Sequence, residues 1–403
     1  MGCINYYKVY FGGIIVKQSY RSILAILLIF NILFISGFAE PSTQVDTDFS
    51  TQLVKGKSGI LIEASTGEVL YEWNPDEKLQ IASVTKTMTM LLIAEALDSG
   101  KINLNDIVTV SEHAASMGGS QVFLEVGEQM TVDDMFKAIA VASGNDAAVA
   151  MAEFIGGTHE AFVEKMNKRA AELGCNNTHF INCNGLDENS EHYSSARDVA
   201  RISQELLKHE IVFDYSTIWM DSLRDGSFGL SNTNKLIRFY QGANGIKTGS
   251  TDMAKYCLSA SAKRDGMQLI AVVLGAPSTG ERFSSATALL DYGFANYAVA
   301  DQESIKPNTP ELTILGGTKE KIKTEVENIN FVVKKGNQDK VESRINMEQT
   351  AKAPIKKGDK VGEIEFCLDG NTITKRNIVA SEDVERIGLL KMFKKLLFHW
   401  IDV

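Results

Sequence analysis

The chain has 403 residues, of which 44% are hydrophobic and 23% charged, as in ordinary globular proteins. This length allows two or three domains and a large core. The 51 acidic residues outnumber the 41 basic ones and give a net charge of −10, so we do not expect nucleic acid as a partner. The six histidines form no metal-binding motif, and we expect neither a metal nor another cofactor.

The N-terminus has the pattern of a secretory signal peptide over residues 1–39. Three basic residues precede the apolar run 23–35, and small residues lead to a cleavage site near Ala39. An uncleaved membrane anchor is the alternative, because the basic region is long, although the apolar run is short for a membrane span. Cleavage would leave residues 40–57 as the leader of an exported mature chain, and loss of the three positive charges would take the net charge from −10 to −13.

Cysteine is sparse in the predicted mature chain. Four cysteines in an exported protein could pair, but their spacing matches neither the disulfide framework of a small secreted domain nor a zinc site. We therefore expect buried free thiols at four positions: Cys175, Cys183, Cys257 and Cys367.

The folded part begins with a predicted hairpin and a helix. Residues 59–63 and 68–73 are strand-like and flank a glycine-containing turn. An apolar run that ends before Gly100 predicts a buried helix with Ser83 in its first turn. Residues three positions apart share a helix face, so Lys86 lies within reach of the Ser83 hydroxyl. This arrangement suits a serine nucleophile with a lysine base, because burial lowers a lysine pKa toward neutrality.

A polar tripeptide separates the next two predicted helices. Thr131 begins a capping-box pattern, and the helix that it opens ends at Ser143-Gly144-Asn145. A serine and an asparagine held on such a turn can face a cleft, although this tripeptide alone is also an ordinary helix-breaking turn.

Further along, residues 179–187 are polar and irregular, and a capped helix follows. In the run 245–251, Gly249 and Ser250 are small enough to let a peptide backbone approach closely, and an edge strand can pair with an extended peptide. Two central strands and a long helix follow, and they complete this domain near residue 300.

The composition changes in the last part of the chain. Proline and glycine punctuate the start of residues 301–380, and short alternating apolar runs predict a small β domain. In residues 381–403, apolar side chains occupy one half of a helical wheel and lysines the other half. Such a helix can dock on the protein's own core, but the lysines, the terminal position and Trp400 favour a helix that lies in a membrane interface.

Three short motifs in fixed order, Ser-x-x-Lys, Ser-x-Asn and Lys-Thr-Gly, together resemble the active-site motifs of the penicillin-binding protein and serine β-lactamase superfamily. A chance Lys-Thr-Gly alone is expected in only about one such chain in ten. The Asn-x-x-Gly-Leu-Asp sequence at 182–187, the His-x-Ser-x-Ala-x-Asp sequence at 192–198, and Gly-Ile-Lys-Thr-Gly-x-Thr at 245–251 narrow the resemblance to the low-molecular-weight D-alanyl-D-alanine carboxypeptidases.

The resemblance covers roughly residues 58–403 and implies an α+β fold. We expect a β-lactamase/transpeptidase-like catalytic domain over residues 58–300, with an antiparallel sheet flanked by helices. A small all-β domain over 301–380 and an amphipathic membrane-anchor helix over 381–403 would follow. The protein would act at the outer face of the cytoplasmic membrane, in the cell-wall space.

The resemblance also implies an activity, which is removal of the terminal D-Ala from peptidoglycan stem pentapeptides through an acyl-enzyme. Ser83 would be the nucleophile, Lys86 the general base and Ser143 the proton relay. The backbone N–H groups of Ser83 and Ser250 would form the oxyanion hole. β-Lactams would inhibit by acylating Ser83, because their ring mimics the D-Ala-D-Ala dipeptide. Six residues would hold the substrate: Asn145, Lys247, Thr248, Gly249, Ser250 and Thr251.

Related activities differ in what they require of the sequence. A β-lactamase would need efficient deacylation, and the glutamate motif that class A enzymes use for it is not evident here. The sequence Ser143-Gly144-Asn145 also departs from their Ser-Asp-Asn. A bifunctional transpeptidase would usually carry an additional N-terminal domain. A DD-endopeptidase and a non-catalytic penicillin-binding sensor or scaffold remain as alternatives.

Overall fold

The computed structural model describes residues 52–186, 191–300, 309–327 and 331–389, with Lys391 and Phe393. The predicted signal peptide and most of the predicted terminal helix lie outside the described residues.

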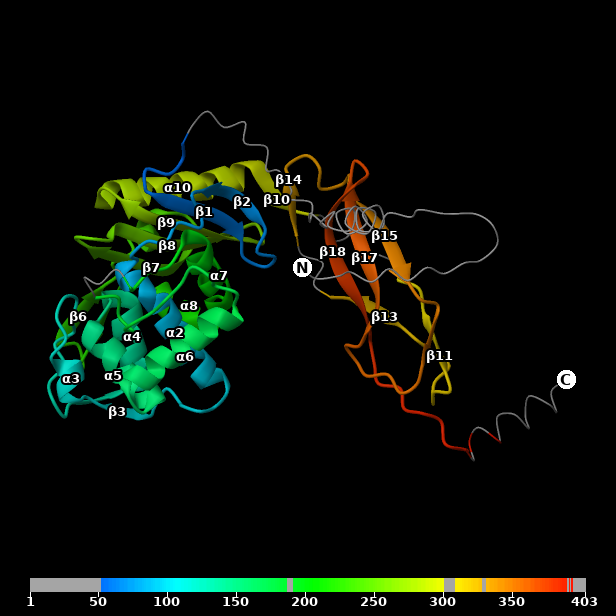
Figure 1. The fold of residues 1–403 in the computed structure, drawn as a ribbon, viewed down its shortest axis with the longest axis horizontal. Coiled ribbons are helices and arrows are strands. Elements are labelled where there is room, and N and C mark those ends of the chain that lie inside the picture. The colour runs from blue at the N-terminus through cyan, green and yellow to red at the C-terminus, as the bar shows by residue number, and fades with distance from the viewer. Residues whose placement is uncertain are drawn as a thin grey trace, which may run out of the picture. The chain divides into compact units, whose positions relative to one another are not determined.

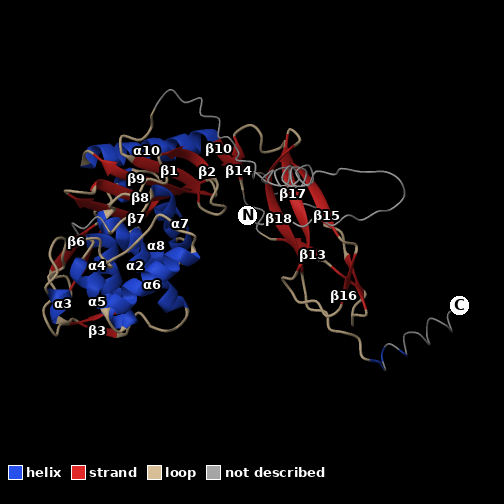
Figure 2. Ribbon diagram, in the orientation of Figure 1, coloured by secondary structure: helices blue, strands red, loops and turns tan. Residues whose placement is uncertain are grey.

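A five-stranded antiparallel sheet forms the centre of the first domain (Figures 1 and 2). Its strand order is β2-β1-β9-β8-β7, so β7 is an edge strand. The middle strands carry long apolar runs that are buried on both faces. The five strands are β1 (Ser58–Glu63), β2 (Val69–Trp73), β7 (Ala243–Thr251), β8 (Lys255–Arg264) and β9 (Met267–Ala276).

Helices cover both faces of this sheet (Figure 1). On one face, α10 (Thr279–Asn296) packs its Leu289 and Leu290 against Leu269 and other strand residues. The other face is covered by a larger helical layer with its own hydrophobic cluster. In this layer, α2 (Lys86–Asp98) is buried along most of its length and contacts most of the other helices. The other helices are α3 (Glu112–Ala115), α4 (Val132–Ala142), α5 (Asn145–Gly156), α6 (His159–Glu172), α7 (Ala196–Leu206), α8 (Ile211–Ser216) and α9 (Leu236–Phe239).

Two small sheets of two strands each lie outside the main sheet of this domain. Strand β3 (Ile107–Thr109) pairs with β4 (Gln129–Thr131), and β5 (Met220–Leu223) pairs with β6 (Phe228–Ser231) in a hairpin. Strand β4 leads directly into α4, where the Thr131 side chain accepts the backbone N–H of Asp134 and confirms the predicted cap.

The start of the nucleophile helix differs from the prediction in one respect. Ser83 lies in a 3-10 turn, η1 (Ala82–Thr85), and the α-helix begins at Lys86. Ala82 adopts a positive φ of 46°, which L-residues with a side chain rarely adopt. The entry to α2 is therefore a 3-10 turn rather than a regular first helical turn.

The C-terminal part is all-β, as predicted. Strands β13 (Thr324–Val326), β18 (Asn371–Ala380), β17 (Lys360–Leu368) and β15 (Glu342–Met347) form one antiparallel sheet. A second sheet contains β12 (Lys321–Ile322), β11 (Leu312–Leu315) and β16 (Thr350–Lys352), and β10 (Tyr297–Val299) pairs with β14 (Val332–Lys334).

The segment predicted to begin the terminal helix at residue 381 is not helical at its start. Val384 bridges to Ile355 and Arg386 bridges to Gly317, so the β domain continues at least to Arg386. These bridges satisfy backbone groups that a helix would otherwise pair internally. Within the residues that the structure describes, no helix has the length and apolar character needed to cross a membrane.

The cysteine prediction is confirmed. All four cysteines of the described chain are free and buried: Cys175, Cys183, Cys257 and Cys367.

Candidate active site

The predicted nucleophile and base are in contact. The Nζ atom of Lys86 lies 3.0 Å from Oγ of Ser83, as expected for residues three positions apart. Nζ also donates to Oδ1 of Asn145 at 2.5 Å and to the carbonyl oxygen of Asn184 at 2.8 Å. Three acceptors therefore surround an amine whose side chain is completely buried, and they fix its position beside Ser83.

Burial also prepares Lys86 for proton transfer. It lowers the pKa of Lys86 to about 7, although Cys183 and Asp146 act in the opposite direction. A lysine with this pKa is partly neutral near pH 7 and can accept the proton of a serine hydroxyl.

The second motif approaches Lys86 from the turn between α4 and α5. Ser143 ends α4 in a left-handed conformation with φ of 64°, and α5 begins at Asn145. The side chain of Asn145 connects two groups, because Oδ1 accepts from Lys86 and Nδ2 donates to the carbonyl of Gly118 at 2.7 Å. Ser143 is buried, and its hydroxyl has no hydrogen-bond partner among the described residues. A buried hydroxyl without a partner is unfavourable, so a bound substrate that supplied a partner would be stabilised.

The third motif lies on β7. Lys247 is buried and donates from Nζ to the carbonyl of Thr248 at 3.0 Å, and no carboxylate of the described chain forms an ion pair with it. Burial, together with the neighbouring cations Lys86 and Arg282, lowers the pKa of Lys247 well below its usual range. A carboxylate bound beside Lys247 would offset the free-energy cost of removing this charged amine from water. The site is therefore suited to an anionic ligand.

Strand β7 passes directly against Ser83, the predicted nucleophile. A Cβ atom at Gly249 would lie 2.8 Å from the backbone nitrogen of Ser83 and 2.6 Å from the carbonyl of Ile81. Only glycine allows this approach. The next residue, Ser250, is exposed, while the Thr251 hydroxyl accepts from the backbone of Ala254.

The structure thus brings the three motifs together. Lys86 contacts Ser83 and Asn145, and Gly249 lies against Ser83. Lys86 is also close enough to Lys247 for its charge to lower the pKa of Lys247.

Several residues that complete the site were not assigned to it from the sequence. The carbonyls of Asn184 and Gly118 fix Lys86 and Asn145, and the Thr248 hydroxyl donates to Oγ1 of Thr233 at 2.7 Å. Arg282 donates from Nη1 to the carbonyl of Gly249 at 3.0 Å and so helps to hold β7 in position. Backbone carbonyls carry no sequence signal, and the only hint was that Asn184 falls within the family signature at 182–187.

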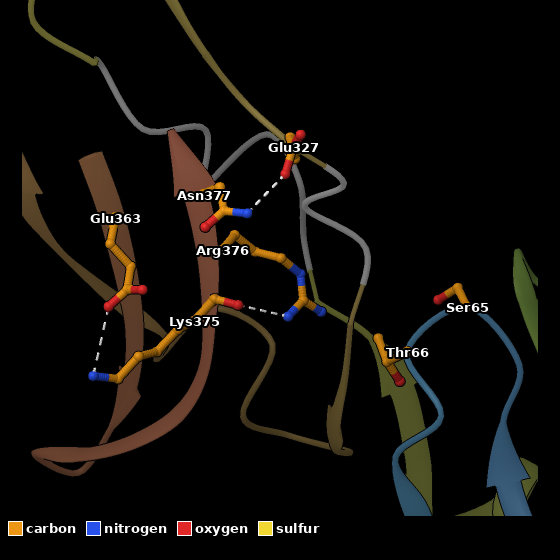
Figure 3. Close-up of a pocket in the computed structure, with 7 residues that line it drawn as sticks. All are labelled: Ser65, Thr66, Glu327, Glu363, Lys375, Arg376 and Asn377. Carbon is orange, nitrogen blue, oxygen red and sulfur yellow. Dashed lines mark hydrogen bonds and ion pairs between the residues drawn. The ribbon is translucent and has the colours of Figure 1, made fainter. Parts of the chain in front are cut away.

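A separate pocket of about 330 Å³ contains none of the motif residues. Figure 3 shows that it is lined by Ser65 and Thr66 of the β1–β2 turn and by residues of the C-terminal β strands, among them Lys375 and Arg376. Positive and negative side chains are mixed there, since Glu363 pairs with Lys375.

Comparison with known proteins identifies the family of the chain. The family described as D-alanyl-D-alanine carboxypeptidase, peptidase S11, matches residues 45–278, and the C-terminal domain of penicillin-binding protein 5 matches residues 305–386. The chain is 47% identical over 351 residues to D-alanyl-D-alanine carboxypeptidase DacF of Bacillus subtilis (strain 168), which covers 86% of this chain and 90% of that protein. It is 34% identical over 383 residues to D-alanyl-D-alanine carboxypeptidase DacC of Escherichia coli (strain K12), with 91% and 94% covered.

Among solved structures, penicillin binding protein 5 from Haemophilus influenzae superposes with a TM-score of 0.73 at 31% identity. The match covers 84% of this chain and 100% of that one. These likenesses confirm the predicted fold class and the resemblance drawn from the three motifs. The chain therefore belongs to the D-alanyl-D-alanine carboxypeptidase family, within the low-molecular-weight penicillin-binding proteins.

Proposed function

We propose that this serine hydrolase removes the terminal D-Ala from peptidoglycan stem pentapeptides through an acyl-enzyme on Ser83. The observation that carries the proposal is the contact between Lys86 and Ser83, in which a buried amine with a pKa of about 7 lies 3.0 Å from a serine hydroxyl. This pair supplies the activated nucleophile that acyl transfer requires.

In the acylation step, neutral Lys86 accepts the proton of Ser83 as its Oγ attacks the carbonyl carbon of the penultimate D-Ala. The C–N bond to the terminal D-Ala then breaks, and the leaving amine receives the proton from Lys86 through Ser143. The Ser143 hydroxyl supports this relay, because it is buried and has no hydrogen-bond partner among the residues that the structure describes. The products are free D-Ala and an ester on Ser83.

The remaining motif residues hold the substrate. Lys247 binds the terminal carboxylate, assisted by Thr248 and Thr251, because an anion there compensates a buried cation. Asn145 holds the substrate amide and orients Lys86. The backbone N–H groups of Ser83 and Ser250 stabilise the oxyanion, and the close approach at Gly249 supports their placement. Deacylation follows when water attacks the ester and Ser83 regains its proton.

The proposed mechanism also predicts inhibition by β-lactams. Opening of the lactam ring by Ser83 leaves a covalent adduct and no separate leaving group, so the acyl-enzyme persists. We further propose that the protein is exported and works on the cell wall. Its attachment to the membrane surface through the segment that follows Arg386 is supported by the amphipathic pattern of that segment.

The test is release of D-Ala from a synthetic pentapeptide ending in D-Ala-D-Ala, by protein lacking residues 1–39. We expect steady release by the parent and none by Ser83→Ala. Penicillin labelling of the parent, but not of Ser83→Ala, gives a second readout. A parent that binds penicillin without releasing D-Ala would point to a DD-endopeptidase or a sensor, and the absence of both reactions would refute the assignment.

A further inference from the structure

A loop over residues 118–124, called here the 118–124 loop, forms one wall beside Asn145. The backbone N–H of Asn145 donates to the carbonyl of Ser120 at 2.7 Å, and its side-chain Nδ2 donates to the carbonyl of Gly118 at 2.7 Å. The loop contains no helix or strand, so regular backbone pairing does not hold it in place.

This contact decides which way the Asn145 amide points. The amide has one donor end and one acceptor end, and Lys86 needs an acceptor. Because the Gly118 carbonyl takes the donor end, Oδ1 is left facing Lys86. If the loop moved away, Asn145 could rotate and present its N–H groups to the lysine amine, which would disturb the base beside Ser83.

Two side chains of opposite charge bind backbone groups of the loop. Asp146 is buried, and its carboxylate accepts the backbone N–H groups of Val122 at 3.0 Å and Leu124 at 3.1 Å. Arg224 donates from Nη1 to the carbonyl of Val122 at 3.0 Å and from Nη2 to the carbonyl of Phe123 at 3.1 Å. The two side chains therefore satisfy loop backbone groups that have no partner in a ladder.

Arg224 comes from a different part of the chain. It lies in the turn of the β5–β6 hairpin, where Nε and Nη2 bind the two carboxylate oxygens of Glu128 at 2.7 and 3.1 Å. This bidentate geometry fixes the plane of the guanidinium. The far end of the same hairpin leads to Thr233, whose hydroxyl accepts from Thr248 of the Lys-Thr-Gly motif. The hairpin that carries Arg224 therefore contacts the 118–124 loop at its turn and leads, at its other end, to the hydrogen-bond partner of Thr248.

We propose that Arg224 is a positioning residue for acylation, which holds the 118–124 loop against Asn145 and so keeps Lys86 aligned with Ser83. The inference rests on the proposed acyl-enzyme function. It predicts that loss of Arg224 slows the chemical step without removing any group that touches substrate.

The experiment compares Arg224→Gln and Arg224→Lys with the parent and with Arg264→Gln, all in protein lacking residues 1–39. Arg264 is a matched control, because it also donates to a backbone carbonyl, that of Gln241, and lies over aromatic rings away from the motifs. The readouts are the rate constant of benzylpenicillin acylation, kcat and KM for D-Ala release, the melting temperature, and hydrogen exchange of the 118–124 loop.

We expect Arg224→Gln to lower the acylation rate about tenfold, mainly in kcat, with faster exchange in the loop and a melting temperature no lower than that of Arg264→Gln. Arg224→Lys keeps the charge opposite Glu128 but not the two carbonyl contacts, so it should fall between the parent and Arg224→Gln. Acylation at the parental rate, unchanged exchange in the loop, or equal slowing in Arg264→Gln would overturn the inference. If the parent itself neither releases D-Ala nor reacts with penicillin, the proposed function fails instead.

Discussion

Gly185 packs so closely against Ala82 that a Cβ atom at Gly185 would lie 1.9 Å from the Ala82 carbonyl oxygen. Gly185 follows Asn184, whose carbonyl binds Lys86, and Ala82 precedes Ser83. The loop at 184–185 thus contacts both Lys86, the proposed base, and the backbone that precedes Ser83, the proposed nucleophile. It packs against the turn in which Ala82 adopts its positive φ.

Gly185→Ala should therefore damage both stability and activity. The positive φ of 77° at this position costs a residue with a side chain about 1 kcal/mol, and the steric clash should add about 1–3 kcal/mol. Displacement of Ser83 should lower penicillin acylation about 100-fold. Gly266→Ala is the matched control, because Gly266 has a φ of 79° but nothing within 4 Å of an added Cβ. Equal melting temperatures and acylation rates for the two variants would contradict this interpretation.

Acylation should depend on the protonation of Lys86. Because the base must be neutral and its pKa is about 7, the acylation rate should fall roughly tenfold per pH unit below about pH 7 and level off above it. The measurement is benzylpenicillin acylation from about pH 5.5 to about pH 8.5, with circular dichroism to show that the protein stays folded. Lys86→Arg should be inactive throughout, since arginine does not deprotonate in this range. A parental rate that does not change with pH would exclude Lys86 as the base.

Lys247→Gln should weaken recognition of the terminal carboxylate. We expect kcat/KM for a peptide ending in D-Ala-D-Ala to fall about 100-fold, because a charged hydrogen bond to the carboxylate is lost. The same peptide with an amidated C-terminus should be affected much less. Lys263→Gln serves as the control, since Lys263 is exposed on the neighbouring strand β8. An equal loss for both peptides would argue against carboxylate binding by Lys247.

The four buried cysteines should be unreactive in the native protein. Burial raises the pKa of Cys175 and Cys183 to about 12 and that of Cys257 to about 11, so little thiolate exists at neutral pH. Protein lacking residues 1–39 should react with Ellman's reagent at four thiols in denaturant and at none when folded. Rapid reaction of one thiol in the native state would reveal an exposed site, and fewer than four in denaturant would reveal a disulfide.

The spacing of residues along the sequence was enough to predict which groups of this protein carry its chemistry. Ser83 and Lys86 are three positions apart, a spacing that brings their side chains together, and no tertiary contact is needed to predict that they meet. Alternating and continuous apolar runs likewise predicted the hairpin, the buried helix α2 and the central strands, because periodicity reports which face of an element is buried.

Only the tertiary structure decided how these groups are tuned and held. The pKa of Lys86 is lowered by surroundings drawn from all parts of the domain, and its acceptors, Asn145 and the Asn184 carbonyl, are far from it in sequence. The roles of Gly185, Arg224 and Arg282 depend on contacts with backbone atoms, which every residue type possesses. Residue identities therefore revealed which groups react, whereas desolvation and backbone contacts appear only when distant segments pack together.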